Sequence, residues 1–345
     1  MLLSQKTLND FLAYYPEIAD ELEAKAATID GTGSGKHLRR VLDYVSEGGK
    51  KYGGIMVTET CKMLTPNLTP EKLKQAYYLG WAVEVLFDGI NMCDDILDGG
   101  HTRRNKTCWY RLEDVKMSAV NDSCLLQTAA FYLLRKHFGH LECFPRLLDI
   151  VNETMFITYM GQHLEISSAH NFKKMTIKNY EAIAARISSN IIGFFPVAMG
   201  MTLAGYKDSE LGKARSILTE LGYIVLIEND FLDCFGDPKI TGKVGRDIQE
   251  GKCRWMAIAC LEHATPAQKE IMLAHYGRDT PEDEAIIKQL YLDVKVPEIY
   301  AAYFKEVYNR MMKNVEENSY GDLKKVYLKL INDLTVSTAA GGFYS

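Results

Sequence analysis

Two aspartate-rich segments contain the side chains best suited to chemistry. The first holds Asp94, Asp95 and Asp98, and the second runs from Asn229 to Asp237. Within each segment the acids recur three or four residues apart, so on a helix they share one face, where like charges repel. Such a face becomes favourable when it binds Mg²⁺, which takes oxygen ligands and accompanies phosphate groups. Two such faces opposed across a helical cavity would assist the departure of a diphosphate group.

We therefore predict that these side chains form the reactive centre. The expected catalytic residues are aspartates of both segments, namely Asp94, Asp95, Asp98 and Asp230. The expected metal ligands are the acidic and amide side chains, namely Asp94, Asp95, Asp98, Asn229, Asp230, Asp233 and Asp237. The amide oxygen of Asn229 can still bind Mg²⁺, but an asparagine carries one negative charge fewer than an aspartate would at this position.

The composition is that of an ordinary globular protein, since 47% of the 345 residues are hydrophobic and 25% are charged. A net charge of −5 gives no reason to expect a nucleic-acid partner, which usually requires a basic surface. No apolar run predicts a membrane span, because the nearest, 191–203, is short and contains Pro196. The N-terminus lacks a signal-peptide pattern. The eight cysteines form no CxxC pair, which favours reduced thiols and a cytoplasmic protein.

Hydrophobic residues recur with helical spacing along the whole chain. The longest apolar stretches span residues 73–97, 124–138, 147–166, 180–203 and 214–235. Turn-forming residues separate the helical segments, namely Gly48-Gly49, Thr65-Pro66-Asn67, Gly99-Gly100, Gly236-Asp237-Pro238 and Thr280-Pro281. We therefore predict an all-α protein in which residues 1–345 form a single domain.

The stretches 73–97 and 214–235 are hydrophobic on nearly all sides apart from their acids, so we expect them to be central, buried helices. An acid on a buried helix costs free energy unless it is paired or binds a metal. This cost is the physical reason for giving the acidic faces a functional role.

Three ordered segments resemble the short-chain isoprenyl diphosphate synthases, the family of farnesyl diphosphate synthase, and most closely the insect terpene synthases derived from it. They are Gly48-Gly49-Lys50, then 94–98 with Thr102-Arg103-Arg104, then 229–255 with Thr241-Gly242-Lys243 and 247–252. The resemblance covers most of the chain, from about Phe11 onward. It implies a class I terpenoid synthase helical bundle around a central cavity, a homodimer and three Mg²⁺ ions. It also implies that diphosphate is contacted by Arg103, Arg104, Lys243 and Lys252.

The departures from this family concern the site of its second substrate, isopentenyl diphosphate. The family has an arginine and a glutamine where this chain has Gly53 and Phe87, although Lys50 remains. The family's basic C-terminal tail is also absent, since residues 339–345 carry no basic side chain. Glycine and phenylalanine cannot replace bidentate guanidinium contacts to phosphate. We therefore interpret Lys50, Gly53 and Phe87 as a degenerate second-substrate site.

The resemblance also predicts which residues line the cavity for the allylic chain, namely Phe87, Asp88, Gly89, Ile90, Asn91, Gln162 and Glu165. Gly89 and Ile90 stand where farnesyl-forming relatives carry bulky aromatics, which would leave volume for a folded C15 or C20 chain. Phe87 either faces a carbocation or packs in the core. Asp88 either orients water or a cation, or makes a structural hydrogen bond to a neighbouring helix, which we favour.

The second acidic segment also resembles that of terpene cyclases. Asn229, Asp233 and Asp237 recur every four residues, similar to the Asn, Ser/Thr, Glu triad with which ionising cyclases hold one Mg²⁺. The alternative is a conservative exchange of one metal ligand for another.

The leading hypothesis from the sequence is a terpene synthase. It would ionise an allylic diphosphate, most readily farnesyl diphosphate, and convert the carbocation to a sesquiterpene hydrocarbon or alcohol. The first alternative is a short-chain isoprenyl diphosphate synthase that condenses isopentenyl diphosphate with an allylic diphosphate. The second alternative is a non-catalytic partner subunit of a prenyltransferase, although such a subunit would not need two unpaired acidic faces.

Overall fold

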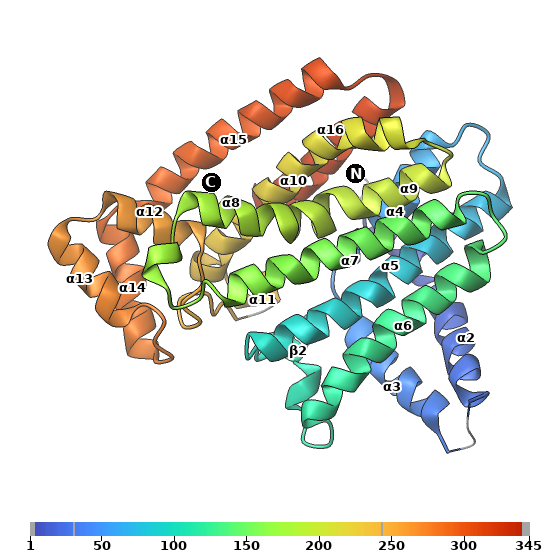
Figure 1. The fold of residues 1–345 in the computed structure, drawn as a ribbon, viewed down its shortest axis with the longest axis horizontal. Coiled ribbons are helices and arrows are strands. Elements are labelled where there is room, and N and C mark those ends of the chain that lie inside the picture. The colour runs from blue at the N-terminus through green and yellow to red at the C-terminus, as the bar shows by residue number, and fades with distance from the viewer. Residues whose placement is uncertain (1–3, 30–31, 243, 340–345) are drawn as a thin grey trace. The chain divides into compact units, whose positions relative to one another are not determined.

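The computed structural model describes residues 4–29, 32–242 and 244–339, and these residues are almost entirely helical (Figure 1). The prediction of an all-α protein is confirmed. Within the described part of the chain, the strands are limited to a short antiparallel hairpin that pairs β1 (Thr102–Arg103) with β2 (Lys106–Thr107). The helices form two compact units, each described by itself below, and the single-domain expectation stays a prediction.

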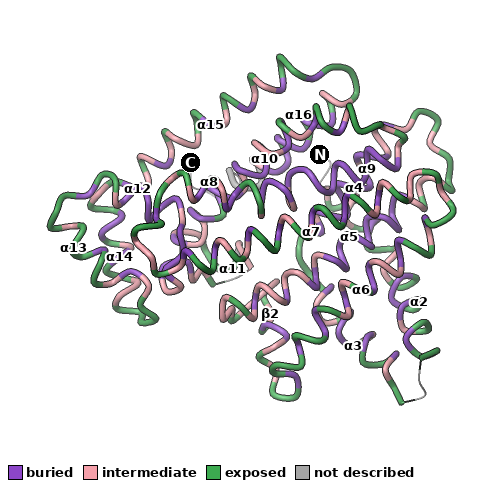
Figure 2. The backbone as a smooth tube through the Cα atoms, viewed as in Figure 1, coloured by how far each residue is buried: buried purple, intermediate pink, exposed green. Residues whose placement is uncertain are grey.

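Unit 1 comprises residues 1–151, 195–211 and 320–345. Its main helices are α1 (Gln5–Leu12), α2 (Tyr15–Ala27), α3 (Ser34–Ser46), α4 (Tyr52–Leu64), α5 (Pro70–Leu97), α6 (Ala119–Phe138), α9 (Phe195–Leu203) and α16 (Gly321–Ala339), with the short turns η1 (Trp109–Arg111) and η2 (Lys116–Ser118). Helix α5 lies at the centre of this unit, where it contacts α3, α4, α6 and α9. Figure 2 shows α4, α5 and α9 mostly buried. The central position predicted for residues 73–97 is therefore correct within this unit.

The ends of α5 follow from local sequence. Thr69 accepts a hydrogen bond from the backbone N–H of Lys72, and Pro70 occupies the first helical position, where a missing N–H costs nothing. The helix ends at the first acidic segment, because Gly99 adopts the left-handed conformation with φ 61°. The acids consequently lie in the last turn of a buried helix, directly before the β1–β2 hairpin.

Unit 2 comprises residues 152–194 and 212–319. Helices α7 (Phe144–Ile166) and α10 (Asp208–Phe235) begin before these ranges, and the other elements are η3 (Phe172–Lys174), α8 (Ile177–Arg186), η4 (Ser189–Phe194), α11 (Pro238–Thr241), α12 (Trp255–His263), α13 (Pro266–His275), α14 (Pro281–Asp293) and α15 (Val296–Asn318). Helix α10 ends at Phe235, and Asp237 then caps α11 by accepting from the Lys239 N–H. The second acidic segment thus spans a helix end and the turn after it.

The predicted stretch 180–203 is not one regular helix. Helix α8 ends at Arg186, and η4 is a turn of π-helix that precedes α9. A Cβ on Gly193 would lie 2.0 Å from the carbonyl oxygen of Leu218, so the wider turn brings its backbone against α10. The span 177–203 is the one candidate membrane helix among the described residues by length and composition, and 67% of its most apolar window is buried inside the protein.

Candidate functional site

The first acidic segment forms a cluster with one guanidinium in unit 1. The Arg103 Nε donates to both carboxylate oxygens of Asp95, at 2.9 and 2.8 Å, and its Nη2 lies 3.2 Å from Asp94 Oδ2. Burial lowers the pKa of Arg103, but the neighbouring Asp95 and Asp94 carboxylates raise it above its ordinary value. Arg103 therefore stays charged and balances the two acids. Asp98 caps the helix end, where its N–H donates to the Asp94 carbonyl.

Arg104 points to a different partner. Its guanidinium lies 2.8 Å from Asp88 Oδ1 and also donates to the Val45 carbonyl. The other Asp88 oxygen accepts from the Ser46 hydroxyl at 2.5 Å. Asp88 is buried, with 3% of its surface exposed. This carboxylate thus joins α3, α5 and the hairpin, which is a structural hydrogen-bonding role.

Gly53 and Phe87 occupy the same space. A Cβ built on Gly53 would lie 2.4 Å from Phe87 Cε2 and 2.7 Å from Phe87 Cδ2. The same Cβ would lie 3.2 Å from Oε1 of the buried Glu84. The Phe87 ring centroid also lies 5.9 Å from that of Phe195 in α9. The aromatic ring fills the room that a side chain at position 53 would need, so the two departures from the family are physically coupled. Lys50 is exposed nearby, with its Nζ 5.3 Å from the Tyr52 ring.

The structure gives Gly89 a role other than adding cavity volume. A Cβ there would lie 2.8 Å from both the Ser123 carbonyl oxygen and Gln127 Cγ of α6. The missing side chain therefore permits close contact between α5 and α6. Ile90 is half-buried, and the Asn91 side-chain oxygen accepts from Arg103 Nη1 at 3.4 Å.

In unit 2, Asp230 lies on the buried side of α10. Its Oδ2 accepts from the Trp255 backbone N–H at 3.0 Å, and its Oδ1 lies 3.6 Å from Arg254 Nε. Burial raises the pKa of Asp230, Arg254 opposes this shift, and the Asp247 carboxylate adds to it. Arg254 also pairs with Glu165 and lies 3.0 Å from Asp247 Oδ2. Arg254 is therefore the shared cation of three buried acids.

The other polar groups of the second acidic segment are more accessible. Asn229 and Asp237 are exposed and Asp233 is half-buried. The Asp233 carboxylate accepts from the backbone N–H groups of Arg246 at 3.3 Å and Asp247 at 2.9 Å, which fastens the following loop. The row of residues at four-residue spacing thus lies on the accessible side of the segment, whereas Asp230 lies on the other.

The remaining predicted residues of unit 2 that the structure describes are Lys252, in the loop before α12, and Gln162 and Glu165, on α7. Lys252 Nζ lies 2.9 Å from Glu250 Oε2 and 3.8 Å from Asp247 Oδ1. Gln162 is half-buried on α7, one turn before Glu165. Lys243, predicted to contact diphosphate, lies outside the described residues. The structure therefore ties Lys252 and Glu165 into one charged network through Asp247 and Arg254.

Among the described residues, no group of three or more His, Cys, Asp or Glu side chains is arranged to hold a metal ion. The donors nevertheless fit Mg²⁺ chemically, because they are carboxylate and amide oxygens, and the Asp94 side chain is 34% exposed. Asp94 would be shared between Arg103 and an arriving cation.

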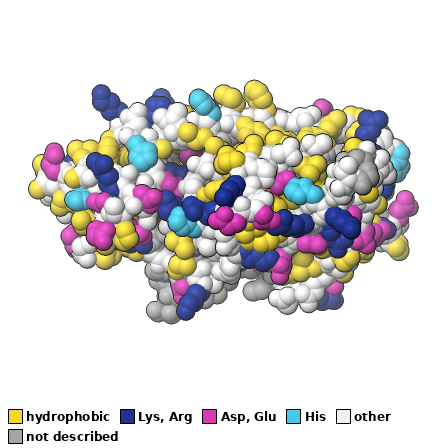
Figure 3. All heavy atoms as spheres, turned by 90° about the horizontal axis from the view of Figure 1, so that it is seen from below, with side chains coloured by type: hydrophobic (Ala, Val, Ile, Leu, Met, Phe, Trp, Pro, Cys, Tyr) yellow, Lys and Arg dark blue, Asp and Glu magenta, His cyan; other side chains and the backbone are white. Residues whose placement is uncertain are grey.

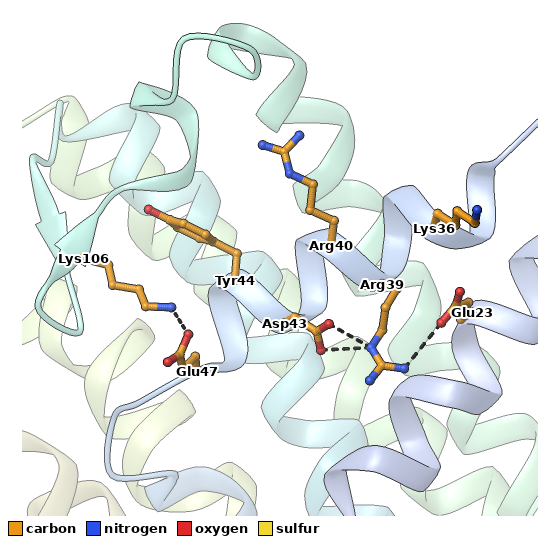
Figure 4. A pocket seen from close by; sticks show the side chains of 8 residues that line it. All are labelled: Glu23, Lys36, Arg39, Arg40, Asp43, Tyr44, Glu47 and Lys106. Atoms are coloured by element: carbon orange, nitrogen blue, oxygen red, sulfur yellow. Dashed lines mark hydrogen bonds and ion pairs between the residues drawn. The ribbon is translucent and has the colours of Figure 1, made fainter.

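Unit 1 contains two pockets that are lined by residues of α3 and of the β1–β2 hairpin. One, of about 480 Å³, opens between α2, α3 and the hairpin (Figure 4). Its charges are largely matched internally, since Arg39 pairs with Asp43 and Glu23, and Lys106 pairs with Glu47. The other is narrow and is lined by residues that include Asp88, Asn91, Asp95, Arg103 and Arg104. On the face shown in Figure 3, basic and acidic side chains are interspersed.

Sequence reasoning missed Arg254, Lys51 and Glu84. Arg254 lies two residues after Lys252, and only its contacts reveal that it binds three acids. Glu84 is three residues before Phe87 on α5, and the available signal was an acid within the apolar stretch 73–97; its burial beside Gly53 appears only in the structure. Lys51 directly follows Lys50 but is buried, which its sequence neighbours do not predict.

Comparisons with known proteins agree with one another. Residues 35–294 match the family model described as polyprenyl synthetase. Over 94% of this chain, farnesyl pyrophosphate synthases of Nezara viridula and Gallus gallus are 35% and 32% identical, and the matches cover 81% and 91% of those proteins. The structure of T. brucei farnesyl diphosphate synthase complexed with risedronate is similar with a TM-score of 0.88 at 26% identity, covering 96% of this chain and 98% of that one.

These comparisons contradict the prediction of a terpene synthase, which is therefore wrong. The relatives that match nearly the whole chain are named as synthases of farnesyl pyrophosphate, as is the similar structure, which agrees with the first alternative. The physical error was to count Gly53 and Phe87 as independent losses, although they fill one space between them. By its matched family model, its relatives and its fold, the chain belongs to the polyprenyl synthetase family.

Proposed function

We propose that the protein is a short-chain isoprenyl diphosphate synthase, which condenses isopentenyl diphosphate with an allylic diphosphate and releases diphosphate. The observation that carries this proposal is the similarity, over 94% of the chain, to farnesyl pyrophosphate synthases. The Asp94–Asp95–Arg103 cluster supports it, because acids and a guanidinium at one helix end suit a metal-bound diphosphate.

The reaction needs positive charge beside the diphosphate group of each of its two substrates. The allylic diphosphate leaves as its carbon–oxygen bond breaks, and Arg103 would stabilise the negative charge that develops on it. The isopentenyl double bond then attacks the allylic cation, and the condensed cation gives a proton to the released diphosphate to form the product. On the second-substrate side, the Arg104 side chain lies against Gly49, and Lys50 directly follows Gly49.

Metal binding belongs to this proposal. Asp94, Asp95 and Asp98 would hold Mg²⁺ in unit 1, and Asn229, Asp233 and Asp237 would do so in unit 2, with three ions expected in total. Bound Mg²⁺ would neutralise the leaving diphosphate. The accessible edge that Asn229 and Asp237 share on unit 2 supports this assignment, and Asp230 would then serve a supporting role through Arg254.

We further propose a cytoplasmic homodimer. The exposed apolar side chains of α7, Phe156 at 72% and Met160 at 50%, are suited to burial by a second copy. Light scattering of the purified protein, with Phe156→Asp as the variant, measures this directly. A monomeric wild type would contradict the dimer.

The function is tested by incubating the protein with Mg²⁺, isopentenyl diphosphate labelled with carbon-14, and C5, C10 or C15 allylic diphosphates. Liquid chromatography of the intact diphosphates should show labelled products lengthened by C5 units, which also identifies the chain length. Hydrocarbons or alcohols formed from the allylic substrate alone, without any lengthened diphosphate, would contradict the proposal. Asp94→Ala serves as the inactive control.

A further inference from the structure

Lys51 is a buried cation with no hydrogen-bond acceptor. The residue is 3% exposed and its Nζ makes no hydrogen bond. It precedes α4 in the left-handed conformation with φ 51°, which is strained for a non-glycine residue. A buried ammonium has three donors, and leaving them unused is costly. A strained, buried donor group without an acceptor is suited to an anion that arrives from outside.

The acids nearest to Lys51 are already occupied by other donors. Glu84 and Asp88 both act on the Lys51 charge, as does Arg104. Glu84 Oε1 accepts from the Gly54 backbone N–H at 2.8 Å. Asp88 is held by Ser46 and Arg104. Two cations and two acids therefore balance in this cluster, but the hydrogen bonds of Lys51 remain to be made.

The cluster adjoins the place of the missing side chain at position 53. A Cβ there would lie 3.2 Å from Glu84 Oε1, so a long basic side chain at this position would share the surroundings of Glu84. Phe87 now excludes such a side chain. Lys51, two residues earlier, and Arg104 are the cations whose charges act on Glu84, and Lys51 acts more strongly.

We propose that Lys51 binds the diphosphate of the homoallylic substrate and so replaces the cation lost at Gly53. This inference rests on the proposed function, since it assigns the second-substrate site of the same reaction. The exposed Lys50 lies next to it at the surface, and the flexible four-carbon stem of Lys51 lets the ammonium turn toward an entering phosphate. Lys51 is consequently a substrate-binding residue outside the positions that the family resemblance indicates.

The test is calorimetric binding of isopentenyl diphosphate to the full-length protein in EDTA, where metal-dependent binding of a diphosphate is suppressed. Lys51→Met should weaken binding by about 10- to 100-fold, the usual effect of losing a charge-assisted hydrogen bond. The matched control is Lys62→Met, which removes a lysine from the far end of the same helix, where it pairs with Glu59. The control should bind as the wild type does.

A second variant separates binding from charge balance. Lys51→Met/Glu84→Gln removes both buried charges, so that neither is left without compensation, and keeps the proposal testable if the single variant does not fold. It too should bind weakly. Adding Gly53→Arg and Phe87→Gln to Lys51→Met should restore binding, because the guanidinium then returns beside Glu84.

Two results would overturn the proposal: Lys51→Met binding isopentenyl diphosphate as tightly as the wild type, or a wild type that does not bind it in EDTA. Because binding is measured without turnover, the outcome is separate from that of the proposed function. A protein that binds isopentenyl diphosphate through Lys51 but makes no lengthened product would refute the function alone.

Discussion

Gly53→Ala tests the contact between Gly53 and Phe87 most simply. The new methyl group would lie 2.4 Å from Phe87 Cε2, more than 1 Å inside the usual carbon–carbon distance of about 3.5–4.0 Å. Overpacking of this kind costs about 1–3 kcal/mol. Alanine in a helix gains up to about 1 kcal/mol over glycine. The net expectation is a free energy of unfolding lowered by roughly 1–2 kcal/mol.

The assay is urea denaturation in a double-mutant cycle with Phe87→Ala. Once the ring is removed, Gly53→Ala should be neutral or stabilising, which gives a coupling energy of about 1–3 kcal/mol. The matched control is Gly212→Ala on α10, where a Cβ meets nothing within 4 Å, so it should stabilise by about 0.5–1 kcal/mol. If Gly53→Ala changes the free energy of unfolding equally with and without the Phe87 ring, the two residues do not compete for the same space and the interpretation is refuted.

Three other predictions concern the charged groups. Asp94→Ala should abolish Mg²⁺-dependent release of diphosphate from allylic substrates, and substantial residual release would contradict its role as a ligand. Arg254→Met should lower the free energy of unfolding by about 3–5 kcal/mol in urea denaturation, because the buried carboxylates around Arg254 lose their counter-charge. A loss below about 1 kcal/mol would show that these carboxylates do not depend on Arg254. Burial raises the pKa of Glu84 and lowers that of Lys51, so both charges cost free energy at neutral pH. Lys51→Met/Glu84→Gln should therefore be more stable than the wild type near pH 7, and this advantage should shrink as the pH falls below the ordinary glutamate pKa of about 4.3, where Glu84 becomes protonated in both folded and unfolded states. An advantage independent of pH would show that the Glu84 charge is not the cause.

The helices were largely predictable because their signals are local. Residues 73–97 carry hydrophobic side chains on almost every face, and Thr69-Pro70 and Gly99 mark the ends of α5. The break within 180–203 was not predictable from the sequence, since the π-turn of η4 depends on close contact with α10. A helical period alone does not report such a contact.

The candidate site was predictable in its residue types and not in its pairings. The sequence shows Asp94, Asp95 and Arg103 close together, and the structure joins them. Gly53 and Phe87 are 34 positions apart, so their overlap appears only when α4 packs on α5. The terpene synthase hypothesis depended on treating them as separate losses.

The most direct test of the central claim is a count of products. In the presence of Mg²⁺ and both substrates, isopentenyl units incorporated and diphosphate released are measured in the same incubation. A condensing enzyme forms one new carbon–carbon bond for each diphosphate that leaves, so the ratio should be close to one. Release of diphosphate with a ratio near zero, accompanied by volatile products, would contradict the proposed function.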